Sequence, residues 1–244
     1  MTQIIPNISV DCVIFGFDFN QLNVLLVERL LKDQQTGQNI IDDWTLVGYH
    51  ILDEEDFDTA AARILNKLSG LDHIYLEQFY AFGKVDRLDN PKDQIWLNNQ
   101  TEGFSKRIVT VGYYALIDNT SVTLTLKERN VQWFPINDLP EIGFDHKDIL
   151  DRALERLRAK LRSEPIGFEL LPEKFTISQL QKLYEAVLGT QFDRRNFRKK
   201  VMQMKYVVPL EEKQTAVRHK PAQLFIFSKD IYEKTKKDRF DFSI

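Results

Sequence analysis

The segment from Thr176 to Lys205 constrains the fold more than any other part of this sequence, because it encodes two short helices in succession. Thr176 and Gln179 have the spacing of a capping box, which begins a helix. Apolar residues then recur with the spacing of one buried helix face, at Leu180, Leu183, Tyr184, Val187 and Leu188. Gly189 stands where helices commonly end, so the sequence predicts a first helix that ends there.

A second, strongly basic helix follows after a turn. Asp193 can cap it, and the segment RRNFRKKVMQMK then turns Phe197, Val201 and Met204 inward. The side chains left pointing mostly outward are Arg195, Asn196, Arg198, Lys199 and Met202. Two short helices of this kind are typical of a helix-turn-helix that reads DNA. Arginine and asparagine can each bond a base edge twice, and lysine binds phosphate.

Two strands after this helix complete the pattern of a winged helix. The sequence predicts a strand at Tyr206–Pro209, a polar loop at Leu210–Thr215 and a return strand at Ala222–Phe227. We expect the DNA contacts to come from the second helix and the wing, at Arg194, Arg195, Asn196, Arg198, Lys199, Arg218 and Lys220. A solvated basic surface is the alternative interpretation. RNA is not excluded by charge, although no exposed aromatic platform is evident.

Charge is distributed unevenly along the chain. From Pro172 to Ile244 there are 16 lysines and arginines against 9 acidic residues, and residues 1–171 have 17 against 27. A basic second part suits a polyanionic partner. The single cysteine, Cys12, excludes an internal disulfide and a cysteine-rich metal site, and no segment is apolar enough to span a membrane. We therefore expect a cytoplasmic protein with no metal, no cofactor and no membrane partner.

The first part of the chain is predicted to form strands around one good helix, Thr59–Leu68, which Gly70 ends. Segments with strand composition are Ile8–Phe17, Leu22–Arg29, Ile74–Phe82 and Ile108–Ile117. The polar stretch Arg87–Ser105 is expected to be a long surface loop. Asp145–Leu161 is an amphipathic helix that either packs on this part or dimerises, and Arg162–Lys174 is expected to be a linker or turn region.

Residues Trp44–Leu71 resemble the Nudix box, in which a glycine and four glutamates stand at fixed spacing. The positions that match are Glu55, Arg63, Leu65, Gly70 and Leu71. Tyr49 takes the place of the glycine, and the other three glutamate positions hold Ile64, Lys67 and Leu68.

These departures remove the chemistry of the resembling enzymes. Nudix hydrolases hold a divalent cation with glutamates on one face of the box helix, and such a cation needs oxygen ligands. Isoleucine and leucine cannot ligate it, and lysine repels it. We therefore expect no catalytic and no metal-binding residues. The alternative, an active nucleotide hydrolase, would have to rebuild the site from Asp53, Glu54, Glu55 or Glu77.

The resemblance continues beyond the box. The segments YLEQFYAFGKVDR, RIVTVGYYALI and WFPINDLPEIGFDHKDIL resemble the strands and closing helix of Nudix proteins. FTISQLQKLYEAVLG and FDRRNFRKKV resemble the winged-helix half of the Nudix-related transcriptional regulators. This implies an α/β fold: a Nudix-like α/β/α sandwich at residues 1–162, closing with helix 145–161, and a winged helix-turn-helix domain at residues 163–244.

The resemblance also implies a homodimeric regulator, in most cases a repressor, that binds double-stranded operator DNA and responds to a small metabolite. One branch responds to ADP-ribose and controls NAD metabolism, and another responds to a sugar such as L-arabinose. The lost glutamates favour the sugar branch, and ADP-ribose is the alternative. A protein-interaction scaffold whose basic module binds an acidic partner is a third hypothesis.

Effector candidates lie on segments expected around the ancestral substrate cleft: Tyr49, His50, Glu55, Glu77, Gln78, Tyr80 and Tyr113. Ordinary packing or surface placement is the alternative for each of them, and His50 is equally expected as a structural histidine. Arg63 is expected to form a buried structural ion pair rather than to touch the effector.

Overall fold

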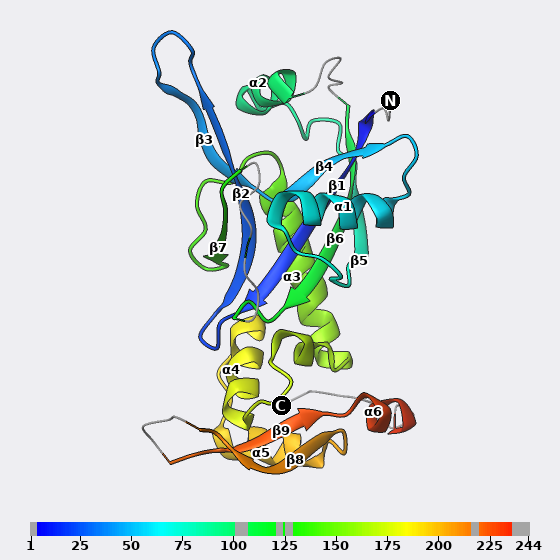
Figure 1. The fold of residues 1–244 in the computed structure, drawn as a ribbon, viewed down its shortest axis with the longest axis vertical. Coiled ribbons are helices and arrows are strands. Elements are labelled where there is room, and N and C mark those ends of the chain that lie inside the picture. The colour runs from blue at the N-terminus through cyan, green and yellow to red at the C-terminus, as the bar shows by residue number, and fades with distance from the viewer. Residues whose placement is uncertain (1–3, 101–106, 121–123, 125–128, 216–219, 236–244) are drawn as a thin grey trace. The chain divides into compact units, whose positions relative to one another are not determined.

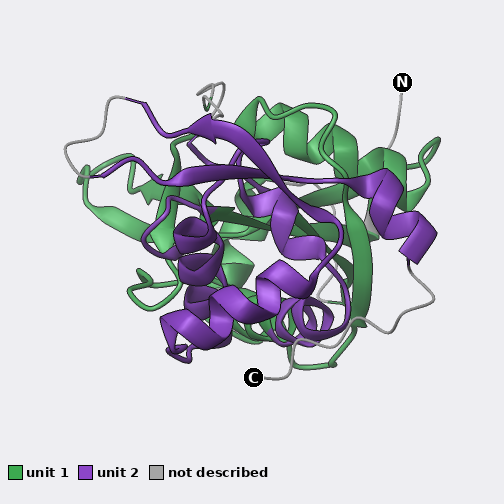
Figure 2. Ribbon diagram, turned by 90° about the horizontal axis from the view of Figure 1, so that it is seen from below, with its two compact units in different colours: residues 1–16, 23–116, 122–154 green, residues 17–22, 117–121, 155–244 purple. Residues whose placement is uncertain are grey.

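The computed structural model describes residues 4–100, 107–120, 124, 129–215 and 220–235 (Figure 1). The chain groups into two compact units (Figure 2): unit 1 has residues 1–16, 23–116 and 122–154, and unit 2 has residues 17–22, 117–121 and 155–244. The division falls inside helix α3 (His146–Ser163). The domain boundary expected between residues 162 and 163 stays a prediction.

The centre of unit 1 is a sheet that contains seven strands among the described residues. They are β1 (Ile4–Phe17), β2 (Leu22–Lys32), β3 (Asn39–Thr45), β4 (Val47–Leu52), β5 (Glu77–Phe82), β6 (Val109–Ile117) and β7 (Val131–Pro135). Their order is β3-β2-β1-β6-β5, with β4 also paired to β1 and β7 also paired to β2. Between β1 and β2 the Asp18 carboxylate accepts the N–H groups of Asn20 and Gln21, which stabilises the turn that joins the two strands.

Helices lie on both faces of this sheet (Figure 1), with α1 in front of it and α3 behind it in that view. Helix α1 (Phe57–Ser69) begins at the Asp56 cap and ends at Gly70, whose φ of 76° is left-handed. The predicted helix at Thr59–Leu68 is therefore confirmed. Cys12 of β1 is completely buried in the core of unit 1, and burial raises the pKa of its thiol.

Helix α2 (Pro91–Gln100) lies in the stretch that the sequence predicts to be a surface loop, so that prediction is wrong. Asp93 and Trp96 on α2 are both buried. Helical periodicity does not reveal this helix, because a long-range ion pair rather than an apolar stripe attaches it to the sheet.

Arg29 of β2 provides that attachment. Its guanidinium donates two hydrogen bonds of 2.6 Å to the Asp43 carboxylate on β3 and one of 2.6 Å to Oδ1 of Asp93 on α2. The ring centre of Phe144 lies 4.5 Å from the guanidinium carbon. A Cβ at Gly143 would come within 2.2 Å of the Arg29 guanidinium, so only glycine fits beside this buried cluster.

Unit 2 contains a small helical core and a two-stranded wing. Its described elements beyond α3 are a 3₁₀ helix (Ile166–Leu170), α4 (Ile177–Leu188), α5 (Arg194–Gln203), β8 (Val207–Lys213), β9 (Gln223–Phe227) and α6 (Lys229–Thr235). The 3₁₀ helix lies in the segment predicted as a linker or turn, and its Phe168 and Leu170 are buried. That segment therefore packs in the core of unit 2.

The predicted caps of the two short helices are confirmed. Thr176 and Gln179 make both hydrogen bonds of the capping box, and α4 ends at Gly189 with a φ of 66°. The Asp193 side chain accepts the backbone N–H groups of Arg195 and Asn196 at the start of α5. Strands β8 and β9 pair antiparallel as a wing. No helix in the described part of the chain is long and apolar enough to cross a membrane.

Candidate functional site

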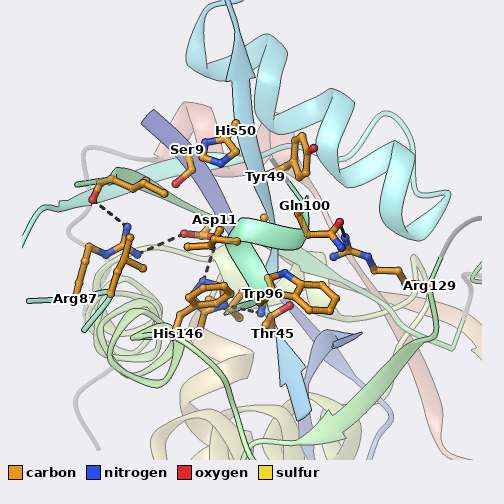
Figure 3. Close-up of a pocket in the computed structure, with 16 residues that line it drawn as sticks. Ser9, Asp11, Thr45, Tyr49, His50, Arg87, Trp96, Gln100, Arg129 and His146 are labelled. Carbon is orange, nitrogen blue, oxygen red and sulfur yellow. Dashed lines mark hydrogen bonds and ion pairs between the residues drawn. The ribbon is translucent and has the colours of Figure 1, made fainter. Parts of the chain in front are cut away.

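A cleft in unit 1 is lined by side chains from β1, β4, α2 and the start of α3 (Figure 3). Its polar and aromatic lining residues are Ser9, Asp11, Thr45, Tyr49, His50, Arg87, Trp96, Gln100, Arg129, Phe144 and His146. Segments more than a hundred residues apart in the sequence thus meet at one place, which gives this cleft the character of a binding site.

Asp11 and His146 form the buried polar floor of the cleft. Nδ1 of His146 accepts the N–H of Leu46 at 3.0 Å, and Nε2 lies 3.4 Å from Oδ1 of Asp11. Because Nδ1 is an acceptor, the ring proton is on Nε2 and faces the carboxylate. Burial lowers the pKa of His146, so the ring is neutral. A Cβ at Gly48 would lie 1.9 Å from Oδ1 of Asp11, so a side chain there would displace the carboxylate.

Arg87 is held in place beside this floor. Its Nε and NH2 groups donate to the Asp145 carboxylate at 2.9 and 2.6 Å, and NH1 donates to the Ile108 carbonyl at 3.3 Å. NH2 is also 3.9 Å from Oδ2 of Asp11. Since these carboxylates already compensate its charge, Arg87 fixes the wall of the cleft more than it offers a charge to a ligand.

The other side of the cleft is aromatic and cationic. The guanidinium carbon of Arg129 lies 4.9 Å from the ring centre of Trp96, and NH2 of Arg129 donates to Oε1 of Gln100 at 2.8 Å. Tyr49 of β4 contributes a second ring, with Nζ of Lys67 lying 5.8 Å from its centre. An aromatic face beside a guanidinium can stack a planar heterocycle and bind a phosphate.

Two of the predicted effector residues, Tyr49 and His50, line the cleft. Nδ1 of His50 lies 3.3 Å from the Ile8 carbonyl, and burial lowers the pKa of the ring. His50 therefore has a structural hydrogen-bond partner as well as a place in the lining.

Glu55 pairs with Arg63 instead of lining the cleft. NH2 of Arg63 donates to Oε2 of Glu55 at 2.8 Å, and a second bond runs from Nε to Oε1. This pairing lowers the pKa of Glu55, which also accepts the N–H of Leu52 at 3.1 Å. The structural ion pair expected of Arg63 is thus confirmed, although its side chain is only partly buried.

The remaining predicted effector residues lie outside this cleft: Glu77, Gln78, Tyr80 and Tyr113. The Tyr113 hydroxyl donates to Asp58 at 2.6 Å, and the guanidinium carbon of Arg152 lies 3.8 Å from the ring centre of Tyr80. A role of these residues and of Glu55 in effector binding stays a prediction.

The sequence did not reveal Trp96, Gln100 and Arg129, because the helix that carries the first two was interpreted as a loop. One signal was available. A tryptophan in an otherwise polar stretch rarely remains in solvent, and the carboxylate of Asp93 three residues earlier could have suggested a packed helix.

The three residues expected to replace glutamates of the Nudix box lie on α1. Ile64 and Leu68 are buried in the core of unit 1, and Lys67 is exposed. Over the residues that the structure describes, no group of three or more His, Cys, Asp and Glu side chains could hold a metal ion.

The basic helix α5 exposes the residues expected to contact DNA: Arg194, Arg195, Asn196, Arg198 and Lys199. Phe197 and Val201 are buried, and Met204 is half-buried at the end of the helix. Lys220 is exposed near β9, and Arg218 lies outside the described residues. The structure thus gathers five predicted contacts on one helix, and their role in DNA binding stays a prediction.

Comparisons with known proteins cover both units. The profile of the NrtR DNA-binding winged helix domain matches residues 167–227. The ADPR responsive transcriptional repressor NtrR of Acinetobacter baylyi is 30% identical over 233 residues, which cover 93% of this chain and 84% of that protein.

Two solved structures share the architecture. The crystal structure of Shewanella oneidensis NrtR complexed with a 27mer DNA is 27% identical, with a TM-score of 0.66, and covers 96% of this chain and 97% of that one. A MutT/nudix family protein from Enterococcus faecalis is 23% identical, with a TM-score of 0.65 and coverage of 91% and 86%. The expected fold, a Nudix-like α/β domain followed by a winged helix, is confirmed.

Proposed function

Because this chain belongs to the NrtR-like family of Nudix plus winged-helix transcriptional regulators, we propose that it is a DNA-binding repressor that responds to ADP-ribose. The observation that carries the proposal is the joint presence of an exposed basic helix in unit 2 and an aromatic, cationic cleft in unit 1. The repressor acts as a homodimer on a palindromic operator, which places two copies of α5 about one DNA turn apart.

DNA binding is assigned to α5. Its first turn exposes Arg194, Arg195 and Asn196, and the helix is fixed by its Asp193 cap and by the buried Phe197. A capped, well-packed helix presents these side chains in a defined geometry, as base reading requires. The exposed lysines and arginines also predict that affinity falls steeply as salt rises.

The effector assignment follows the chemistry of the cleft. ADP-ribose has a purine ring and a diphosphate, which suit the aromatic lining of the cleft and the Arg129 guanidinium respectively. A neutral sugar has no charge for Arg129 to bind. The similarity to the ADPR responsive repressor of Acinetobacter baylyi favours the same ligand. We therefore prefer ADP-ribose to a sugar such as L-arabinose, although the lost glutamates favour the sugar.

The Nudix-like unit binds this ligand without hydrolysing it. Ile64 and Leu68 lie in the core and position 67 is a lysine, so this face of helix α1 has no set of carboxylates that could bind magnesium. ADP-ribose bound to the cleft therefore acts as a signal that lowers the affinity of the protein for DNA. A coupling free energy of about 1–3 kcal/mol corresponds to a change of about 5–150-fold.

The test is DNA binding by the full-length protein, measured by fluorescence anisotropy with a duplex that the protein selects from a randomised pool. ADP-ribose, AMP and L-arabinose are titrated into the complex, and we expect only ADP-ribose to release the DNA strongly. Release by L-arabinose alone would restore the sugar hypothesis. Absence of salt-sensitive DNA binding would instead favour the interaction scaffold.

Two matched variants locate the effector site. Arg129→Gln removes a guanidinium from the cleft, and we expect it to weaken the ADP-ribose response about 10-fold or more. Arg152→Gln makes the same change beside Tyr80, outside the cleft, and we expect no effect. The opposite result would place the effector near the predicted Tyr80 site. Magnesium-dependent hydrolysis of ADP-ribose that Glu55→Gln abolishes would revive the enzyme hypothesis.

A further inference from the structure

Met202 is a half-exposed apolar side chain on an otherwise polar helix surface. Its exposed fraction is 50%, and it is one of seven large apolar residues that the described part of the chain exposes. The other six belong to unit 1, at Leu30, Ile40, Tyr75, Tyr80, Val85 and Ile95. A single exposed apolar residue is common on a protein surface, so its neighbours decide whether it has a role.

Those neighbours are three of the basic residues of α5. With 3.6 residues per turn, Met202 lies about 20° around the helix from Arg195, and Arg198 and Lys199 flank both of them. Phe197 and Val201, which are buried, lie about 200° and 240° from Arg195. The stripe of Arg195, Arg198, Lys199 and Met202 is therefore the part of α5 that points away from its own core.

This stripe has the spacing of a reading helix. Its members stand at positions i, i+3, i+4 and i+7, the spacing with which the third helix of a homeodomain reads base edges in the major groove. The same geometry places Asn196 about 100° away from Arg195, at the edge of this stripe.

We propose that Met202 is a specificity-determining residue that contacts the 5-methyl group of a thymine in the operator. The inference rests on the proposed function, because it requires α5 to enter the major groove. Thymine is the base whose major-groove edge carries a methyl group, and this is the group that an apolar side chain can read. Arginine and lysine bind acceptors on bases and phosphates, so Met202 adds a signal that the basic residues of the stripe cannot supply.

The position of the thymine follows from the helix. Met202 lies seven residues after Arg195, which is about 10 Å along the helix axis. Each base pair adds about 3.4 Å to the length of the duplex, so the thymine lies about three base pairs from the base that Arg195 contacts. In a palindromic operator the same thymine occurs once in each half-site.

Deoxyuridine provides the probe, because it differs from thymidine only in lacking the 5-methyl group. In the duplex selected by the full-length protein, each thymine is replaced in turn by deoxyuridine, and the Kd is measured at constant salt. For the wild type we expect one position per half-site at which the replacement weakens binding about 4-fold. This is the effect of losing the burial of one methyl group.

Two variants identify the residue responsible. Met202→Gln keeps the length of the side chain but makes it polar, and we expect it to bind thymine and deoxyuridine at that position equally well. Met202→Leu keeps the apolar contact and retains the discrimination. Arg195→Ala lowers the affinity but also retains the discrimination. Since Met202 is exposed, its variants should keep the melting temperature of the wild type, and only variants that do so are compared.

Two results overturn the inference in different ways. Strong DNA binding with the same deoxyuridine effects in the wild type and in Met202→Gln removes Met202 from base reading but leaves the repressor hypothesis intact. If the full-length protein selects no DNA at low salt, the proposed function fails, and the role of Met202 fails with it.

Discussion

Replacing Arg29 with methionine should destabilise unit 1 strongly. Arg29 is 1% exposed, and it is the cation that compensates the carboxylates of Asp43 and Asp93, which are 2% and 1% exposed. Methionine fills a similar volume but leaves both carboxylates without their three hydrogen bonds from the guanidinium. Removing one partner of a buried ion pair typically costs about 3–5 kcal/mol, and we expect a loss of at least this size.

Asp93→Asn is the matched control for this prediction. The amide oxygen of the new asparagine can still accept hydrogen bonds from the Arg29 guanidinium and from the N–H of Phe144. Arg29 then forms an ion pair with the single carboxylate of Asp43. We therefore expect a loss of about 1 kcal/mol or less.

Urea unfolding followed by tryptophan fluorescence is the appropriate assay. All three tryptophans, Trp44, Trp96 and Trp133, belong to unit 1, so the signal reports this unit separately. The free energy of unfolding follows from the midpoint and the slope of the transition. If Arg29→Met loses less than about 1 kcal/mol, or no more than Asp93→Asn, the buried cluster does not hold α2 to the sheet as we argue.

Three further outcomes follow from local geometry. Gly48→Ala should lower the free energy of unfolding of unit 1 by about 1–3 kcal/mol, because its Cβ would meet the Asp11 carboxylate. Gly83→Ala is the control: the nearest atom to its Cβ would be 3.6 Å away, so the urea midpoint should change little. Burial lowers the pKa of His146 below 6.5, so the unfolded chain binds a proton at this residue at a higher pH than the folded chain does. The free energy of unfolding should therefore decrease below about pH 6.5, by at most about 1.4 kcal/mol per pH unit. His146→Asn should show a smaller decrease between pH 7 and 5. Asp193→Ala removes the cap of α5 and should lower the stability of unit 2 by about 0.5–2 kcal/mol. Thermal unfolding followed by circular dichroism can measure this loss. An unchanged melting temperature would contradict the role of this cap.

Much of unit 2 could be predicted from the sequence because its determinants are local. The capping box at Thr176, the left-handed Gly189 and the Asp193 cap each act within a few residues, and the structure has all three. The inward and outward faces of α5 follow from helical periodicity alone.

The cleft could be predicted only in part, because its walls depend on contacts between distant segments. Tyr49 and His50 were found through their place in the segment that resembles the Nudix box. Trp96 was missed because α2 is attached by the pairing of Asp93 with Arg29, which are 64 residues apart. No pattern within α2 itself indicates that partner.

The complete burial of Cys12 makes this chain suitable for site-specific labelling. A thiol that is inaccessible and has a raised pKa reacts poorly with maleimides, so the natural cysteine need not be removed. A cysteine introduced at an exposed position such as Gln203 on α5 would carry a single dye. In the proposed homodimer, two such dyes would report the separation of the two α5 helices by energy transfer while ADP-ribose is added.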